Sequence, residues 1–272
     1  MPDFPHFTLA DFDDPPVVET VLSLQFEEIP GMQAAHFGLF WGKVKARFPN
    51  TEEGTALSAV LERFPEQVSR GRIRFELPEK LEPPRLLFLN QAGSEMIQLQ
   101  RNRFIKNWRK TGSDDQYPHY EPVIKPAFER DFGEFQSFLA EEQLGPITIN
   151  QCEITYVNHI VSGAGWQELA EIDQIFTFVA LASSPAPGKP EDFGIHIRFP
   201  IPDDRERLIG RLHVDIQPAL RARDDRPMYV MSLTARGQYG SAFEFFDIGR
   251  EWIVRSFEQL TTERMHHIWR KK

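Results

Sequence analysis

Two histidines and an aspartate in neighbouring apolar runs are the residues of this sequence best suited to acid–base chemistry. His196 lies in GIHIRFPI (194–201), and His213 and Asp215 lie in RLIGRLHVDIQ (207–217). Both runs alternate apolar and polar residues, as half-buried strands do, so the three polar side chains would share one face of a sheet. An imidazole beside a carboxylate is the smallest general-base pair. The same alternation adds cations that could hold an anionic substrate: Arg198, Arg211 and Arg236.

This polar face also has an interpretation without catalysis. Opposite charges on neighbouring strands stabilise ordinary sheets by ~0.2–1 kcal/mol per pair. The sequence holds no nucleophile elbow, phosphate-binding loop, GxGxxG or HExxH motif. We therefore favour a non-enzymatic protein, and an enzyme acting on an anionic substrate through His196, His213 and Asp215 is the alternative.

Metal and cofactor sites find little support in the residue types. Cys152 is the single cysteine, so it can form no intramolecular disulfide and belongs to no cluster that would hold zinc. His266 and His267 are adjacent, and on a helix their side chains would point about 100° apart. We expect no metal and no cofactor.

A second candidate surface is the run EMIQLQRNRFIKNWRK (95–110), which places five cations in its last ten residues although the formal net charge of the chain is −9. Guanidinium groups suit phosphate and carboxylate, and aromatic rings can stack on a base. The candidate ligand-binding residues are Arg101, Arg103, Phe104, Lys106, Trp108 and Arg109. Read as one long strand, the run has no purely apolar face, so the strand passes from buried to exposed along its length or carries a bulge that reverses its faces. The alternative to a binding site is a strand that ends in solvent, with its cations paired to Asp114 and Asp115.

The composition is that of a globular protein with a substantial core. The chain has 272 residues, 41% hydrophobic and 26% charged, and 23 of them are phenylalanine. A pI near 5.5 argues against nucleic-acid binding by the whole surface, so a nucleic-acid binder is only the second alternative. The acidic, proline-containing start lacks the features of a signal peptide, and no run approaches the ~20 apolar residues that span a bilayer. We expect a cytoplasmic protein that does not enter membranes.

The hydrophobic periodicity predicts an α+β fold with antiparallel strands. Strands are expected at 17–26 and 147–160, and helices at 32–48 and 123–143. Shorter apolar runs occur at 72–77 and 85–90, a short helical segment at 164–172 and a loop at 183–192. Three alternating runs follow, and the capping box from Ser241 to Glu244 opens a last helix.

The element order predicts an internal duplication. Each half reads as a strand, a helix, several antiparallel strands and a long helix, which gives an arm (1–16) and two halves (17–145 and 146–272) packed as one integral unit. The expected architecture is a curved sheet, or two, backed by helices, by analogy with helix-grip or TATA-binding-protein-like folds. Phe4, Phe7 and Phe12 would anchor the arm. The alternative is a chance match of common α+β elements.

Several stretches resemble a sporadically distributed family of uncharacterised bacterial proteins. They are PPVVETVLSLQF (15–26), IQLQRNRFIKNWRK (97–110) followed by YPHYEP (117–122), and SFEQLTTERMHHIWR (256–270). The resemblance spans nearly the whole chain and implies an accessory role linked to mobile elements or defence, without assigned catalytic residues. Together these observations favour a binding protein that engages a protein, peptide or anionic ligand through a sheet surface.

Overall fold

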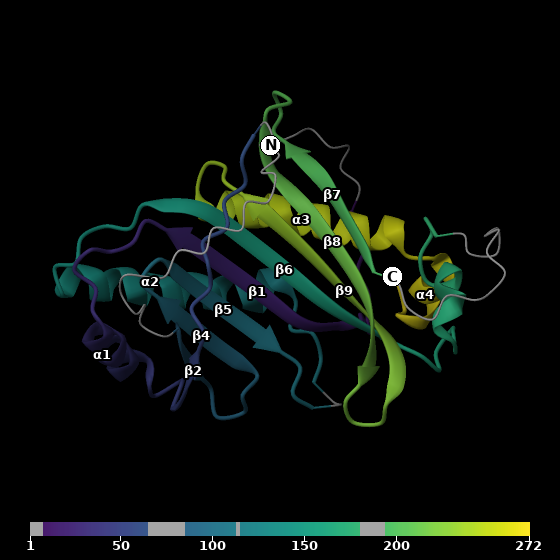
Figure 1. Ribbon diagram of the computed structural model, residues 1–272, viewed down its shortest axis with the longest axis horizontal. Helices are drawn as coiled ribbons and strands as arrows, with labels where there is room; N and C mark the ends of the chain where they lie inside the picture. The colour runs from purple at the N-terminus through teal and green to yellow at the C-terminus, as the bar shows by residue number, and fades with distance from the viewer. Residues whose placement is uncertain (1–7, 65–84, 113–114, 180–193) are drawn as a thin grey trace, which may run out of the picture. The chain divides into compact units, whose positions relative to one another are not determined.

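The computed structural model describes residues 8–64, 85–112, 115–179 and 194–272 (Figure 1). The strands are β1 (Val17–Phe26), β2 (Asn50–Gly54), β3 (Arg85–Leu89), β4 (Glu95–Gln100), β5 (Arg103–Arg109), β6 (Ile149–Val161), β7 (Ile195–Pro202), β8 (Leu208–Arg221) and β9 (Arg226–Gly237). The helices are α1 (Ala34–Val44), α2 (Lys125–Glu141), α3 (Ala242–Leu260) and α4 (Glu263–Ile268), with a π-helical turn η1 (Tyr120–Ile124) and a 3₁₀ helix η2 (Leu169–Gln174).

Most elements expected from the periodicity are confirmed. The strands at 17–26 and 147–160 are β1 and β6, and the three long helices are α1, α2 and α3. Ser241 accepts a hydrogen bond from the Glu244 backbone N–H and Glu244 accepts one from the Ser241 N–H, so the capping box is present. The apolar run at 72–77, the loop at 183–192, and the anchors Phe4 and Phe7 lie outside the described residues.

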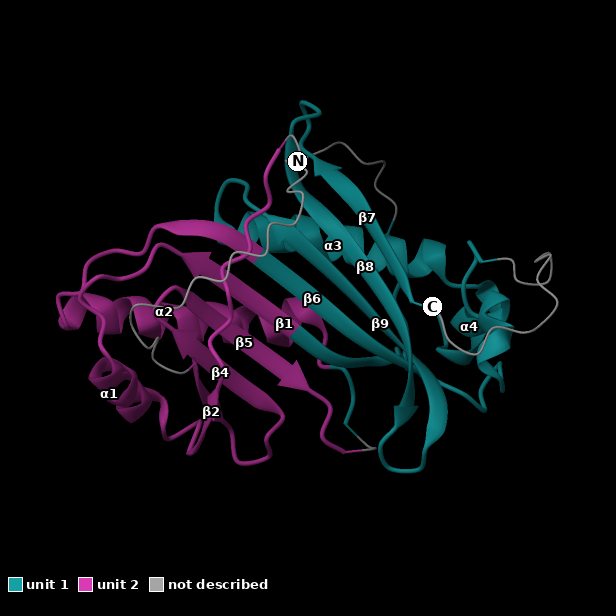
Figure 2. Ribbon diagram, viewed as in Figure 1, with its two compact units in different colours: residues 1–20, 114–117, 153–272 teal, residues 21–113, 118–152 magenta. Residues whose placement is uncertain are grey.

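The strands of the described residues form one open sheet with helices behind it. Its order is β2-β3-β4-β5-β1-β6-β9-β8-β7, and the hairpin neighbours pair antiparallel. The chain divides into two compact units, which Figure 2 colours separately: unit 1 comprises residues 1–20, 114–117 and 153–272, and unit 2 comprises 21–113 and 118–152. The α+β class with a helix-backed antiparallel sheet is therefore confirmed.

Unit 2 is held together by phenylalanines. The Phe104 ring on β5 lies 5.4–5.8 Å, between ring centroids, from Phe128, Phe132 and Phe135, which recur along one face of α2. Phe40 of α1 joins the same cluster through Phe135 at 5.2 Å. This cluster fixes α2 on one face of the unit 2 strands and leaves their other face to be covered by something else.

In unit 1, α3 packs against β9 and β6 at a glycine. A Cβ added to Gly249 would lie 2.7 Å from Ile154 Cγ2 and 3.0 Å from Ala235 Cβ, so the close approach of the helix requires glycine here. At the two ends of the chain, Phe12 is buried and its ring packs edge-on against Phe257. The predicted anchoring role of Phe12 is thereby confirmed. Among the described residues, no helix has the length and apolar character needed to cross a bilayer.

Candidate functional site

The cation-rich run 95–110 is a hairpin, so its prediction as a single strand is wrong. β4 ends at Gln100, Arg101 and Asn102 form the turn, and Gln100 pairs with Arg103 across it. Neither turn residue has positive φ, so the turn lacks the Asn-Gly type of signal that marks many two-residue hairpins. Because the turn contains two residues, odd positions of β4 share a face with even positions of β5.

The hairpin distributes the six candidate ligand-binding residues over different environments. Phe104 and Lys106 lie on the face that carries α2, and Phe104 is fully buried, so its ring has no exposed face on which a base could stack. Trp108 shares the strand face of these two residues and is half-buried. Arg103 and Arg109 lie on the opposite face, and Arg101 occupies the turn.

Lys106 belongs to a buried charge cluster. Its ammonium lies 2.7 Å from Asp131 Oδ2 and 2.7 Å from Glu95 Oε2, and it sits 4.5 Å above the ring of Phe48. Arg47 reaches the other carboxylate oxygen of Asp131 at 3.0 Å. Opposite charges that satisfy one another out of water are a structural arrangement, and they explain why a lysine is tolerated inside β5.

The three arginines of the run bind groups of their own chain. Arg101 pairs with Glu28 at 3.2 Å, and Arg109 Nε donates to the Gly93 carbonyl at 2.7 Å. Arg103 is buried and donates to the Gln25 side chain at 2.5 Å. These six residues are therefore not assembled around one hollow, and their role in ligand binding stays a prediction.

The histidine–aspartate group of unit 1 is assembled as the alternation predicts. In the β7–β8 register His196 faces Asp215 and Arg198 faces His213, and in the β8–β9 register Arg211 faces Arg236. These side chains alternate with buried apolar residues of the same strands, so they share the sheet face opposite α3. We call this set the arginine–histidine layer: His196, Arg198, Arg211, His213, Asp215 and Arg236.

The shortest contact in the arginine–histidine layer joins His196 Nδ1 to Asp215 Oδ1 at 2.6 Å. Both side chains are about half exposed, at 52% and 46%, and the His213 ring lies 6.0 Å from that of His196. Ser232 faces Asp215 from β9. Asp215 thus stands between the histidine and the serine, whereas a nucleophilic triad needs the imidazole in the middle.

The arginine–histidine layer continues onto β6 through two side-chain contacts. Arg236 Nε lies 2.5 Å from Glu153 Oε2, and both side chains are about one-fifth exposed. In the neighbouring row the hydroxyls of Thr155 and Thr234 are 2.8 Å apart. Arg211 and Arg236 face one another directly in register, a like-charged pair that is unfavourable in isolation, and Glu153 supplies a negative charge beside Arg236.

A third polar group was not anticipated from the sequence. Buried glutamines lie on the face of unit 2 opposite α2, and each binds the main chain of a segment that follows β2. They are Gln25 on β1, Gln100 on β4 and Gln151 on β6. The sequence did hold a signal for this group, because Gln98 and Gln100 stand at alternate positions of an otherwise apolar strand. A strand face that is buried by apolar packing would carry apolar residues at those positions.

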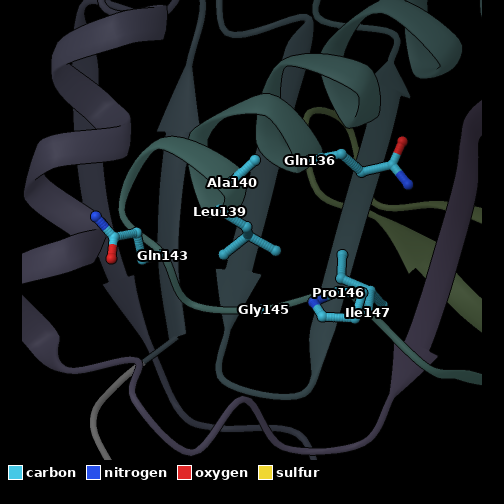
Figure 3. A pocket seen from close by; sticks show the side chains of 7 residues that line it. All are labelled: Gln136, Leu139, Ala140, Gln143, Gly145, Pro146 and Ile147. Atoms are coloured by element: carbon cyan, nitrogen blue, oxygen red, sulfur yellow. The ribbon is translucent and has the colours of Figure 1, made fainter.

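The hollow at the end of α2 holds no group for chemistry. Figure 3 shows this space of about 540 Å³ beside the last turn of α2 and the chain that follows it. Its lining has amide, aliphatic and backbone groups and no charged side chain: Gln136, Leu139, Ala140, Gln143, Gly145, Pro146 and Ile147. It gives no support to a catalytic assignment.

The lone cysteine and the two adjacent C-terminal histidines show no arrangement for chemistry. Burial raises the pKa of the Cys152 thiol to about 12, so this cysteine stays protonated and unreactive. His266 is buried, with its Nε2 2.8 Å from the Thr261 hydroxyl, while His267 is exposed. Among the described residues, no group of three or more histidine, cysteine or acidic side chains is arranged to hold a metal ion.

Comparisons with known proteins found no match to this chain. No protein-family model, curated protein or solved structure matches it.

Proposed function

We propose that the protein is a non-catalytic binding protein that holds an acidic segment of a partner on the arginine–histidine layer of unit 1. The observation that carries the proposal is the register of β8 and β9, which sets Arg211 directly opposite Arg236. A like-charged cross-strand pair is destabilising in isolation. Glu153 offsets part of that repulsion at Arg236. A bound carboxylate would add further negative charge to this row of cations, and guanidinium groups suit carboxylates.

The spread of the cations favours an extended acidic peptide over a single small anion. Arg198, Arg211 and Arg236 lie on three successive strands, and neighbouring strands are about 4.8 Å apart, so the cations span roughly 10 Å. A chain with several carboxylates can reach all three. Asp215, Glu153 and the net charge of −9 oppose any polyanion. They oppose duplex nucleic acid most, because it carries one negative charge per ~1.7 Å of its length.

The short contact between His196 and Asp215 supports an enzyme as the second candidate. The pair has the geometry of a general base and its orienting carboxylate. The serine opposite Asp215 is not placed to be activated by His196, so hydrolysis would need a water nucleophile. The half-exposed surroundings supply none of the water exclusion that strengthens electrostatic catalysis.

We also infer that the two units are copies of one ancestral plan. In the sheet order, β1 lies beside β5 and β6 lies beside β9, so the first strand of each half neighbours the last. A long helix follows that last strand in each half, α2 after β5 and α3 after β9. This common wiring supports the duplication and the analogy with helix-grip or TATA-binding-protein-like folds. Profiles of homologous sequences test it, because β5–α2 should align with β9–α3, and failure to align would contradict it.

The binding proposal is tested by charge-neutralising variants in the full chain. A fluorescein-labelled octaglutamate peptide is titrated in 50 mM salt, and R198Q/R211Q should weaken its affinity at least tenfold. The matched control R205Q/R223Q removes two exposed arginines from the loops that join β7 to β8 and β8 to β9, so it makes an equal change in net charge. The control should bind as wild type does. Equal losses in both variants, or no binding by wild type, would refute the acidic-segment assignment.

A further inference from the structure

Residues 55–62, here called the strap, cross unit 2 on the sheet face opposite α2 (Figure 1). Gln100 on β4 binds the main chain of Leu57 twice: its Oε1 accepts from the Leu57 N–H at 3.0 Å and its Nε2 donates to the Leu57 carbonyl at 2.9 Å. Arg103 on β5 donates to the Ser58 carbonyl at 3.1 Å. A glutamine amide used in this way imitates the backbone of a neighbouring strand.

The contacts continue in the order in which the strands lie in the sheet. Gln25 on β1 accepts from the Val60 N–H at 2.9 Å, and Gln151 on β6 accepts from the Glu62 N–H at 2.7 Å. The strands β4, β5, β1 and β6 are consecutive neighbours. Three inter-strand steps across β4, β5, β1 and β6 cover about 14 Å, and the five residue-to-residue steps from Leu57 to Glu62 cover about 16 Å when extended. The strap is therefore long enough to reach the hydrogen-bonding side chain of each strand in turn.

The strap binds the sheet face through its main chain. Its central residues are exposed, including Val60 at 43% and Leu61 at 42%. The groups beneath it are buried, with Gln25, Gln100 and Gln151 at most 5% exposed. No apolar side chain of the strap is buried, so the hydrogen bonds between the sheet face and the strap main chain do not depend on which apolar side chains the strap carries.

The same face has a spare acceptor next to the strap. Gln98 lies two residues before Gln100 on β4, so the two side chains share a face, and Gln98 is 8% exposed. Its Nε2 donates to Asn107, but its Oε1 accepts no hydrogen bond from the described residues. A buried acceptor without a donor is unfavourable, and a second bound main chain could satisfy it.

We propose that this glutamine face, formed by Gln25, Gln98, Gln100, Arg103 and Gln151, is a binding site for an extended segment of a partner protein. The strap occupies the site within the chain and is the competitor that the partner segment displaces. After the strap leaves and before the partner segment binds, water can form hydrogen bonds with the glutamine side chains, so none of them stays buried without a hydrogen-bond partner. This site lies in unit 2 and is independent of the acidic-segment site proposed for unit 1.

The exchange is tested by removing the N–H groups that hold the strap. L57P/V60P deletes the donors to Gln100 and Gln25, whereas A59P/L61P changes two positions whose N–H groups make no hydrogen bond within the described residues. The probe is a fluorescent synthetic peptide of sequence TALSAVLERF (55–64), and the readout is its anisotropy on titration. L57P/V60P should bind it at least tenfold more tightly than wild type and A59P/L61P. Equal affinity of all three proteins would overturn the proposal.

A modified probe separates main-chain recognition from adhesion of apolar side chains. N-methylation at the positions of Leu57 and Val60 removes the two N–H donors and should abolish binding to L57P/V60P, whereas N-methylation at Ala59 should not. Indifference to the position of the methyl groups would overturn main-chain recognition. Formation of a dimer when wild-type and L57P/V60P proteins are mixed would show that copies of this chain exchange straps. That result would contradict a partner segment as the occupant of the site.

A measurement on the unmodified protein covers the case in which L57P/V60P does not fold. Excess peptide should accelerate amide hydrogen exchange at Leu57 and Val60 of the wild-type strap, because it displaces them from the glutamine face. Amides of β5 should keep their protection. Unchanged exchange of the strap in saturating peptide would refute displacement.

Discussion

Asp131 is fully buried on α2, and its two carboxylate oxygens receive Lys106 at 2.7 Å and Arg47 at 3.0 Å. The three groups are mutually dependent, because Lys106 is itself only 5% exposed in its side chain. Burial of either charge alone would be costly, so the carboxylate makes the lysine of β5 compatible with a phenylalanine core.

Asp131→Ala should lower the free energy of unfolding by about 3–5 kcal/mol, since it leaves a buried ammonium with a depleted set of acceptors. The matched control is Glu134→Gln, which loses a contact with Arg47 at a carboxylate that is 37% exposed. It should cost at most about 1 kcal/mol. Urea unfolding of both variants checks the prediction, and similar losses would show that the cluster is not buried as described.

The buried imidazole of His266 should make the free energy of unfolding depend on pH under mildly acidic conditions. Burial holds the pKa of its imidazole below the ordinary value, and Lys271 lowers it further. The unfolded chain takes up a proton near pH ~6.5, while the folded chain does so only at lower pH. The unfolded state therefore binds more protons in that window, and the free energy of unfolding falls by up to about 1.4 kcal/mol per pH unit as pH decreases.

His266→Gln should flatten this dependence between pH 7.5 and 5.5 in urea unfolding experiments. His267→Gln, a change at the exposed neighbour, should leave the wild-type slope intact. Because burial also lowers the pKa of His159, part of the dependence should remain in His266→Gln. A slope that His266→Gln leaves unaltered would show that His266 titrates normally.

At the scale of elements, the packing of the two long helices gives a pair of glycine substitutions with opposite signs. Gly249→Ala should destabilise unit 1 by about 1–3 kcal/mol, because the new methyl group would overlap Ile154 and Ala235. In Gly133→Ala on α2, a Cβ would meet nothing within 4 Å, so the change should stabilise by about 0.5–1 kcal/mol. Thermal unfolding of the two variants measures both signs, and destabilisation by Gly133→Ala would contradict the placement of α2.

The helices and the polar face of unit 1 could be predicted because their patterns are local. The capping box at Ser241 and the alternation around His213 each lie within one element, and the structure keeps them. The turn at Arg101 and Asn102 was missed because two residues without positive φ give no turn signal. A single strand would place Arg103 on the face of Ile97, whereas the hairpin places Arg103 opposite Gln100 and on the face away from α2.

At the scale of the whole molecule, the sites depend on pairings that no local pattern encodes. Gln25, Gln100 and Gln151 are far apart in sequence, and only the strand order aligns them beneath the strap. The expected free second face is therefore partly covered in unit 2, where the strap crosses the face opposite α2. In unit 1 the face opposite α3 carries the arginine–histidine layer. Both surfaces are polar and face away from α2 or α3, which supports the interpretation as a binding protein.

The most direct test of that interpretation is a map of where an acidic peptide contacts the whole protein. Octaglutamate is titrated into ¹⁵N-labelled, deuterated protein, and backbone amide shifts are followed by transverse-relaxation-optimised NMR. The binding account predicts saturable shifts confined to β7, β8 and β9 around Arg198, Arg211 and Arg236, which disappear in R198Q/R211Q and persist in R205Q/R223Q. Saturable shifts centred on other strands, or no shifts at millimolar peptide, would contradict it.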